Sequence, residues 1–167
     1  MTKILELTKE NESKYLDKIG ELENLTLEVM KKEGREGQLF ATGAEDISEY
    51  IHSDENTVIV AVNEEDEVET YELAFDGLVV NKLSRTVRID NELIDFRPKE
   101  FDLLVFLIEN HRIALDRDRI LDAVWGIDYF GDTRVVDTHI KKIRKKLGTY
   151  AKYIHTVFGV GYKFEVI

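Results

Sequence analysis

The sequence predicts an α+β chain in which a small α/β unit precedes a second unit made of a four-stranded antiparallel sheet, three helices and a C-terminal β-hairpin. Three observations predict this organisation. Acidic and basic residues are divided unevenly along the chain, short strand-like segments with turn signals follow residue 70, and helical periodicities then precede a final pair of alternating segments. From them we expect residues 1–69 to form the first unit and residues 70–167 the second.

The composition excludes several classes of protein. The chain has 167 residues, with 34 Asp or Glu, 23 Lys or Arg, a net charge of −11 and no cysteine. The absence of cysteine excludes disulfides, thiolate zinc sites and cysteine nucleophiles. The longest apolar run, Leu103 to Ile108, is far shorter than a membrane span, and the charged N-terminus does not resemble a secretory signal. We therefore expect a cytoplasmic protein with no membrane partner.

The charge distribution separates the two units. Residues 1–70 carry 19 acids and 7 bases, whereas residues 71–167 carry 15 acids and 16 bases. The acidic run Asn63 to Glu69 marks a short linker or turn between them. The stretch Arg134 to Lys146 has six bases and one acid, a basic patch on an acidic protein that points to nucleic acid as a partner.

The first unit has the pattern of a strand at residues 3–8, an amphipathic helix at residues 12–32, a shorter helix from Thr42 and a buried strand at residues 57–62. Thr42 and Glu45 have the spacing of a capping box. The apolar stripe of the long helix consists of Tyr15, Ile19, Leu22, Leu25 and Val29, and that of the short helix of Ile47, Tyr50 and Ile51.

The order of these elements over residues 3–69 resembles the first half of the GNAT acetyltransferase fold. The glycine-rich loop that holds the acyl-CoA pyrophosphate in that family is absent, and Gly34-Arg35-Glu36-Gly37 has the wrong spacing for it. We therefore interpret this unit as a non-catalytic appendage that serves dimerisation, partner contact or control, and we predict no cofactor and no enzyme activity.

The second unit opens with four short strands and two helices. The strands are expected at Tyr71–Phe75, Leu78–Asn81, Thr86–Ile89 and Glu92–Asp95, with turns at Asp76-Gly77 and Asp90-Asn91. One helix begins at Pro98, a residue suited to a first turn, and another follows Asp116, a plausible N-cap. Their buried faces are expected to be Phe101, Leu104, Val105 and Ile108 in the first and Ile120, Leu121, Val124 and Trp125 in the second.

The third helix, about Thr133 to Leu147, carries the basic patch. Val136, Ile140, Ile143 and Leu147 are spaced four, three and four residues apart, so they share one face. Arg134, Thr138, Lys141 and Lys145 fall on the opposite face, flanked by Lys142, Arg144 and Lys146. Such a helix fits the major groove of B-DNA, where Lys and Arg bind phosphates or guanine edges. The alternative is a helix whose lysines only meet solvent.

The chain ends in the pattern of a hairpin. Two alternating segments between Tyr153 and Val166 flank Gly159-Val160-Gly161, and Tyr162, Phe164 and Val166 share one face. A hairpin that follows a basic helix can contact the neighbouring minor groove.

Together these segments resemble the winged helix-turn-helix output domain of the OmpR/PhoB family of bacterial transcription regulators. The matching segments are Pro98-Lys99-Glu100-Phe101-Asp102-Leu103-Leu104, Val124-Trp125-Gly126, Arg134-Val135-Val136-Asp137-Thr138-His139-Ile140, Ile143-Arg144-Lys145-Lys146-Leu147 and Thr156-Val157-Phe158-Gly159-Val160-Gly161-Tyr162. The resemblance implies a phosphorelay-type output domain that binds specific double-stranded DNA sequences and regulates transcription.

The resemblance also implies site residues. Nine side chains are expected at DNA, namely Arg134, Thr138, His139, Lys141, Lys142, Arg144, Lys145, Thr156 and Phe158. The loop residues expected at RNA polymerase are Ile127, Asp128, Tyr129 and Phe130. Structural roles are the alternatives for several of these residues and their neighbours: His139 bonds a backbone carbonyl, Tyr129 and Phe130 cover the core, Asp137 pairs internally, and Trp125 anchors the core.

The sequence departs from the family in three places. Arg97 stands where the family favours a Ser or Thr N-cap, and Phe158 replaces the usual basic residue of the wing. About 70 residues precede Tyr71, fewer than the roughly 120 of a phosphorylatable receiver domain, so control by aspartyl phosphorylation is not expected.

Two further hypotheses remain open. One is a degenerate acyltransferase relative that uses the winged domain to bind protein. The other is that the acidic first unit masks the basic helix until another partner displaces it. A homodimer is also expected by analogy with the family.

Overall fold

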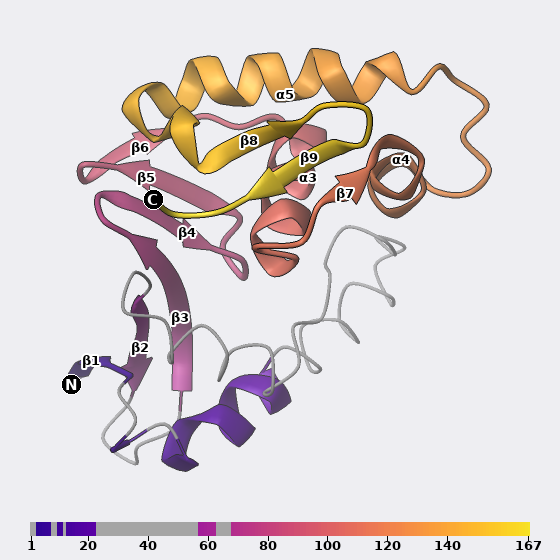
Figure 1. Ribbon diagram of the computed structural model, residues 1–167. Coiled ribbons are helices and arrows are strands. Elements are labelled where there is room, and N and C mark those ends of the chain that lie inside the picture. Colours follow the sequence, from indigo (N-terminus) through magenta and orange to yellow (C-terminus); the bar gives the residue numbers. More distant parts are fainter. Residues whose placement is uncertain (1–2, 8–9, 12, 23–56, 63–67) are drawn as a thin grey trace. The chain divides into compact units, whose positions relative to one another are not determined.

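The computed structural model describes residues 3–7, 10–11, 13–22, 57–62 and 68–167 (Figure 1). The chain divides into two compact units, residues 1–93 and 94–167, rather than at the predicted boundary between residues 69 and 70. From here on, the first and second units are these two ranges. Each is described by itself below. None of the helices within the described residues is long and apolar enough to span a bilayer.

The first unit contains a sheet in which neighbours in sequence are neighbours in space. Its order is β1-β2-β3-β4-β5-β6, and the pairs from β1 to β5 are antiparallel. The strands are β1 (Lys3–Glu6), β2 (Thr57–Val62), β3 (Val68–Phe75), β4 (Leu78–Asn81), β5 (Thr86–Ile89) and β6 (Glu92–Ile94). The four strands predicted after residue 70 are present as β3 to β6, but they belong to a six-stranded sheet with β1 and β2 rather than to a separate four-stranded sheet.

The strand β3 begins earlier than the sequence suggested. Val68 and Glu69, which we assigned to the linker, are its first two residues. The strand β3 pairs with β2, so the two strands belong to one sheet. The acidic residue Glu69 is compatible with this pairing, because the backbone hydrogen bonds between strands do not depend on the charge of the side chains. The assignment of separate roles to residues 1–69 and 70–167 stays a prediction.

Part of the first unit's core is described. The helix over residues 13–22 buries Tyr15 and Ile19, as its predicted stripe required. Leu25, Val29 and the helix expected from Thr42 lie outside the described residues. The buried apolar side chains described in β3 to β5 are Leu73, Phe75, Leu78, Val80 and Val87.

The turns of this sheet lie where the sequence placed them. Asp76 has a φ of 52°, and Asp90 and Asn91 have φ values of 49° and 69°. Asp and Asn tolerate this left-handed region better than other residues with a Cβ, because their short polar side chains bond locally.

The second unit packs three helices against a three-stranded sheet of order β7-β9-β8 (Figure 1). Its elements are α3 (Pro98–Glu109), β7 (Leu115–Asp116), α4 (Arg117–Trp125), α5 (Arg134–Leu147), the 3₁₀ helix η1 (Gly148–Tyr153), β8 (Ile154–Val157) and β9 (Gly161–Phe164). The predicted order of three helices and a C-terminal hairpin is confirmed.

The starts of α3 and α4 follow from their capping residues. Asp116 is the N-cap of α4, and its Oδ1 accepts a hydrogen bond of 2.8 Å from the Arg119 amide. At α3 the Arg97 side chain caps nothing; instead Glu100 accepts from the Arg97 amide at 3.0 Å. The departure at Arg97 is thus compensated from inside the first turn.

Candidate nucleic-acid interface

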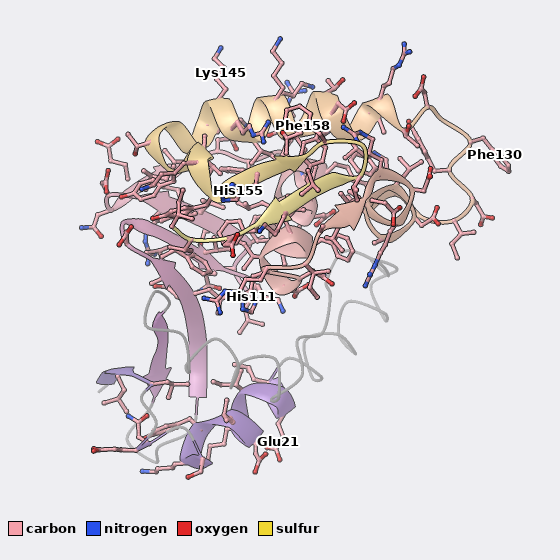
Figure 2. All side chains as sticks on the ribbon, in the orientation of Figure 1. Glu21, His111, Phe130, Lys145, His155 and Phe158 are labelled. Atoms are coloured by element: carbon pink, nitrogen blue, oxygen red, sulfur yellow. The ribbon has the colours of Figure 1, made fainter. Side chains whose placement is uncertain are left out.

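The helix α5 has one buried and one exposed face. Val136, Ile140, Ile143 and Leu147 are no more than 1% exposed and form the core side of the helix. The exposed polar side chains on the rest of the helix are Arg134, Thr138, Lys141, Lys142 and Lys145. Figure 2 shows Lys145 projecting from α5 away from the body of this unit. A cationic face braced by aliphatic side chains is therefore present, as the sequence predicted.

The first turn of α5 is stabilised by residues within it and just before it. Asp132 accepts a hydrogen bond of 2.8 Å from the Arg134 amide, and the Thr138 hydroxyl donates to the Arg134 carbonyl at 3.1 Å. The Arg134 side chain is 87% exposed, and its Nε lies 3.8 Å from the Asp132 carboxylate. This long, exposed ion pair leaves most of the guanidinium in contact with solvent.

Arg144 lies between α5 and the hairpin rather than on the exposed face. Its Nη2 donates to the Ile154 carbonyl at 2.7 Å and to the Thr156 hydroxyl oxygen at 2.9 Å, and its guanidinium lies 5.6 Å from the centre of the Tyr162 ring. Thr156 is exposed, and a hydroxyl that accepts from Arg144 keeps its own hydrogen for donation. Arg144 therefore orients Thr156 and retains its charge close to it.

His139 has the structural role that we considered. Its Nδ1 lies 2.9 Å from the Val135 carbonyl oxygen, and its ring contacts Trp125 edge to face at a centroid distance of 5.0 Å. The bond to a backbone carbonyl is confirmed, and its role at DNA stays a prediction.

Lys146, which we expected beside the cationic face of α5, is instead bonded to residues of the same unit. Its ammonium bonds the Glu100 carboxylate at 2.5 Å and the Asp95 carbonyl at 2.6 Å. The Glu100 side chain is only 3% exposed. Burial raises the pKa of Glu100, but the bonds from Lys146 and the Arg97 amide outweigh it, so the pKa lies below its usual value. Lys146 thus stabilises the fold.

Asp137 joins three elements. It accepts hydrogen bonds from Arg117 Nε at 2.8 Å and from the Tyr162 hydroxyl at 2.6 Å. Arg117 also donates to the Val160 carbonyl at 3.1 Å. The interpretation that Asp137 pairs internally is confirmed. No sequence pattern indicated Arg117 as its partner, because the two residues are brought together only by the packing of α4 against α5.

The charges of this network follow from its contacts. Burial raises the pKa of Asp137, but bonds from Tyr162 and Arg117 reverse the effect and hold it below the usual value. The pKa of Tyr162 is raised by burial and by its bond to Asp137. At neutral pH the network therefore consists of a carboxylate, a guanidinium and an uncharged phenol.

Replacing Asp137 with alanine is expected to destabilise the second unit by about 1 kcal/mol, the value of a partly exposed charged hydrogen-bond acceptor. Because the folded pKa of Asp137 is depressed, its contribution is present above the unfolded pKa and is lost as pH falls through the folded pKa. Urea unfolding at pH 7 and pH 3 should show a difference from wild type that shrinks in acid. Asp122→Ala, an exposed carboxylate on α4, is the control; an effect equal to that of Asp137→Ala would contradict the assignment.

The hairpin tip is closed tightly. The Val160 amide donates to the Val157 carbonyl at 3.0 Å, and Gly159 has a φ of 77°. A Cβ on Gly161 would lie 2.1 Å from the Leu115 carbonyl oxygen, so the close approach of β9 to β7 requires glycine there. Phe158, between these residues, is 93% exposed.

The loop between α4 and α5 presents apolar side chains. Phe130 and Ile127 are 98% and 86% exposed, and Asp128 is exposed beside them. The alternative that Phe130 covers the core is therefore wrong. Tyr129 is 38% exposed, and its ring centre lies 6.4 Å from that of Trp125.

Comparison with known proteins finds transcriptional regulatory proteins. The family model described as "Transcriptional regulatory protein, C terminal" matches residues 90–164. The uncharacterized transcriptional regulatory protein YclJ of Bacillus subtilis (strain 168) is 44% identical over 107 residues, which are 63% of this chain and 45% of that protein. The chain spans less than half the length of the curated relatives it matches.

The similar solved structures include the following two. One is the DNA-binding domain of RstA from Klebsiella pneumoniae in complex with the RstA box, with 31% identity, a TM-score of 0.52 and coverage of 57% of this chain and 98% of that one. The other is the response regulator DrrB of Thermotoga maritima, an OmpR/PhoB homologue, with 35% identity, a TM-score of 0.52 and coverage of 60% and 46%.

Proposed function

We propose that this chain, which belongs to the OmpR/PhoB-type family of transcriptional regulatory proteins, binds specific double-stranded DNA sequences through its second unit and so regulates transcription. The observation that carries the proposal is the exposed cationic face of α5, set on a buried aliphatic face. A protein with this function acts where the chromosome lies, so we expect it in the cytoplasm with the nucleoid.

In this proposal α5 enters the major groove. An α-helix fits that groove, where Lys and Arg reach phosphates and the acceptor atoms of guanine. Arg134, Thr138, Lys141, Lys142 and Lys145 are exposed along the helix and supply these groups. Each phosphate that a cation neutralises releases counterions, which gives affinity at low salt.

The hairpin supports docking at the adjacent backbone. Thr156 is exposed next to Arg144, and together they offer a hydroxyl and a guanidinium to one phosphate. His139 lies behind this surface with its ring against Trp125, so we expect it to position α5 at the groove.

The loop of Ile127, Asp128, Tyr129 and Phe130 is proposed to contact RNA polymerase. Two of its apolar side chains are almost fully exposed, and exposed apolar residues beside a polar one are typical of protein-binding surfaces. The resemblance of this segment to the polymerase-contacting loop of the family supports the same partner.

Selection of bound duplexes from a random library, followed by titration at several salt concentrations, tests the function. A single enriched motif is expected, with log K falling against log salt at about −0.9 per neutralised phosphate. Two motifs about one helical turn apart would indicate that a pair of chains binds. No enrichment, or a slope near zero, would contradict the proposal.

The comparisons do not favour the acyltransferase alternative, because the family model that matches residues 90–164 and the relative YclJ are both transcriptional regulatory proteins. Titration of the chain with acetyl-CoA by calorimetry is expected to give no heat of binding.

A further inference from the structure

The tip of the hairpin presents an aromatic ring where a DNA-binding surface ordinarily has charge. Phe158 is 93% exposed, and the tip residues Val157 to Gly161 include no charged side chain. Exposing a ring of this size to water is unfavourable unless a partner covers it, since burying a Phe contributes about 1.5–3 kcal/mol. The ring therefore points to a partner with an apolar or stacking surface.

The hairpin that carries Phe158 is fixed to the helices at several points. On β8, Thr156 is bonded to Arg144 of α5. On the other side, the Tyr162 hydroxyl is bonded to Asp137 of α5, and the Val160 carbonyl to Arg117 of α4. A ring on such a support loses little conformational freedom when it binds.

Phe158 is the first residue of the turn between β8 and β9, directly after Val157, the last residue of β8. It lies two residues along the chain from Thr156. Thr156 is bonded to Arg144 of α5, so the end of β8 that leads into the turn is close to this helix. DNA that contacts α5 and Thr156 would therefore lie near the hairpin tip.

We infer that Phe158 inserts between two stacked base pairs from the minor groove adjacent to the major groove that α5 occupies, and so kinks the duplex. Phe is among the side chains that unstack base steps in this way, and such a wedge needs no charge of its own when nearby cations hold the phosphates. The inference rests on the proposed DNA binding and adds a determinant of sequence preference to it, because pyrimidine–purine steps kink most easily.

A second copy of the chain fits the observations less well. One Phe side chain buries about 150–250 Å². A stable protein interface needs about 800 Å² from each partner. The other large exposed apolar residue on the hairpin is Val160, which is 41% exposed, so the tip alone does not supply that area.

The test uses the full chain and a duplex that it selects from a random library. The duplex carries 2-aminopurine in place of adenine at the base step that the hairpin contacts, and a donor and an acceptor dye at its two ends. Wild type should raise 2-aminopurine emission, shorten the end-to-end distance and select a pyrimidine–purine step at that point. Phe158→Ala should bind about tenfold more weakly, since base–aromatic stacking contributes about 1–3 kcal/mol. It should lose both optical signals but keep the salt slope, because no charge is removed.

Two variants sharpen the result. Phe158→Trp should keep the emission change and the bend, and Phe158→Arg should lose them while steepening the slope by about 0.9. Ile113→Ala, an exposed apolar residue of the same unit, should behave as wild type. The wedge would be overturned, and DNA binding would stand, if Phe158→Ala binds and bends the duplex as the wild type does. The same conclusion would follow if Phe158→Ala binds more weakly but the wild type itself does not change the 2-aminopurine emission. Failure of the wild type to bind any selected duplex would overturn the proposed function itself.

Discussion

Replacing Lys141, Lys142 and Lys145 together with alanine is expected to make the salt slope of DNA binding shallower by about 2.7, because each phosphate that is no longer neutralised reduces the slope by about 0.9. All three side chains are exposed on one helix whose opposite face is buried, so their removal leaves the core unchanged. If they contact phosphates, affinity falls by a similar factor on every duplex, which titrations at several salt concentrations would measure.

The control for this prediction is Lys152→Ala. Lys152 is an exposed lysine of η1, its ammonium lies over the Tyr153 ring, and it is not on α5. A triple variant that keeps the wild-type slope would show that the lysines meet only solvent. If the variant instead weakens binding at one base position more than at others, one of the lysines reads a base edge.

Replacing Lys146 with methionine is expected to destabilise the protein by about 3 kcal/mol, the lower end of the range for breaking a buried ion pair, because Lys146 itself is 27% exposed. The variant leaves the Glu100 carboxylate buried, with the Arg97 amide still donating to it. Urea unfolding at pH 7 measures the loss of stability, and the m-value should stay unchanged.

The pH dependence of this variant distinguishes the ion pair from simple packing. In the wild type the pKa of Glu100 is depressed, so its stabilisation is present above the unfolded pKa and is lost as pH falls through the folded pKa. In Lys146→Met burial is offset only by Arg97, so the pKa of Glu100 is higher than in the wild type and protonation relieves part of the penalty in acid. The difference between the two proteins should shrink from pH 7 to pH 4.

Glu100→Gln in the Lys146→Met background is the matched control. The neutral amide removes the buried charge, so the double variant should be more stable than Lys146→Met alone at pH 7. A difference from wild type that is the same at every pH, with no recovery in the double variant, would contradict the ion-pair interpretation.

The fold of the second unit could be predicted because its signals are local. The spacing of Val136, Ile140, Ile143 and Leu147 fixed the buried face of α5, and Asp116 fixed the start of α4. The glycines at 159 and 161 marked the hairpin turn, where the structure has a left-handed residue and a close backbone approach. The buried face of α5, the cap of α4 and the turn at Gly159 depend on residues within one or two turns of the chain, whereas the close approach at Gly161 is to Leu115 of β7.

The roles of individual cations could not be predicted in the same way. Lys145 and Lys146 are neighbours of the same type on one helix, yet Lys145 meets solvent and Lys146 meets Glu100, 46 residues earlier in the chain. Arg144 bonds a carbonyl on β8 that follows it by 10 residues. Such choices depend on which element packs beside α5, and periodicity carries no information about that.

The hydrogen bond between Tyr162 and Asp137 and the one between Arg144 and Thr156 join α5 and the hairpin into one rigid unit. A protein built this way cannot stretch or shorten the separation between the two segments that would touch the duplex. The length of its recognition sequence is then set by the chain rather than by the DNA. One base pair inserted between the two contacted stretches should prevent one of the segments from docking, whichever bases are inserted.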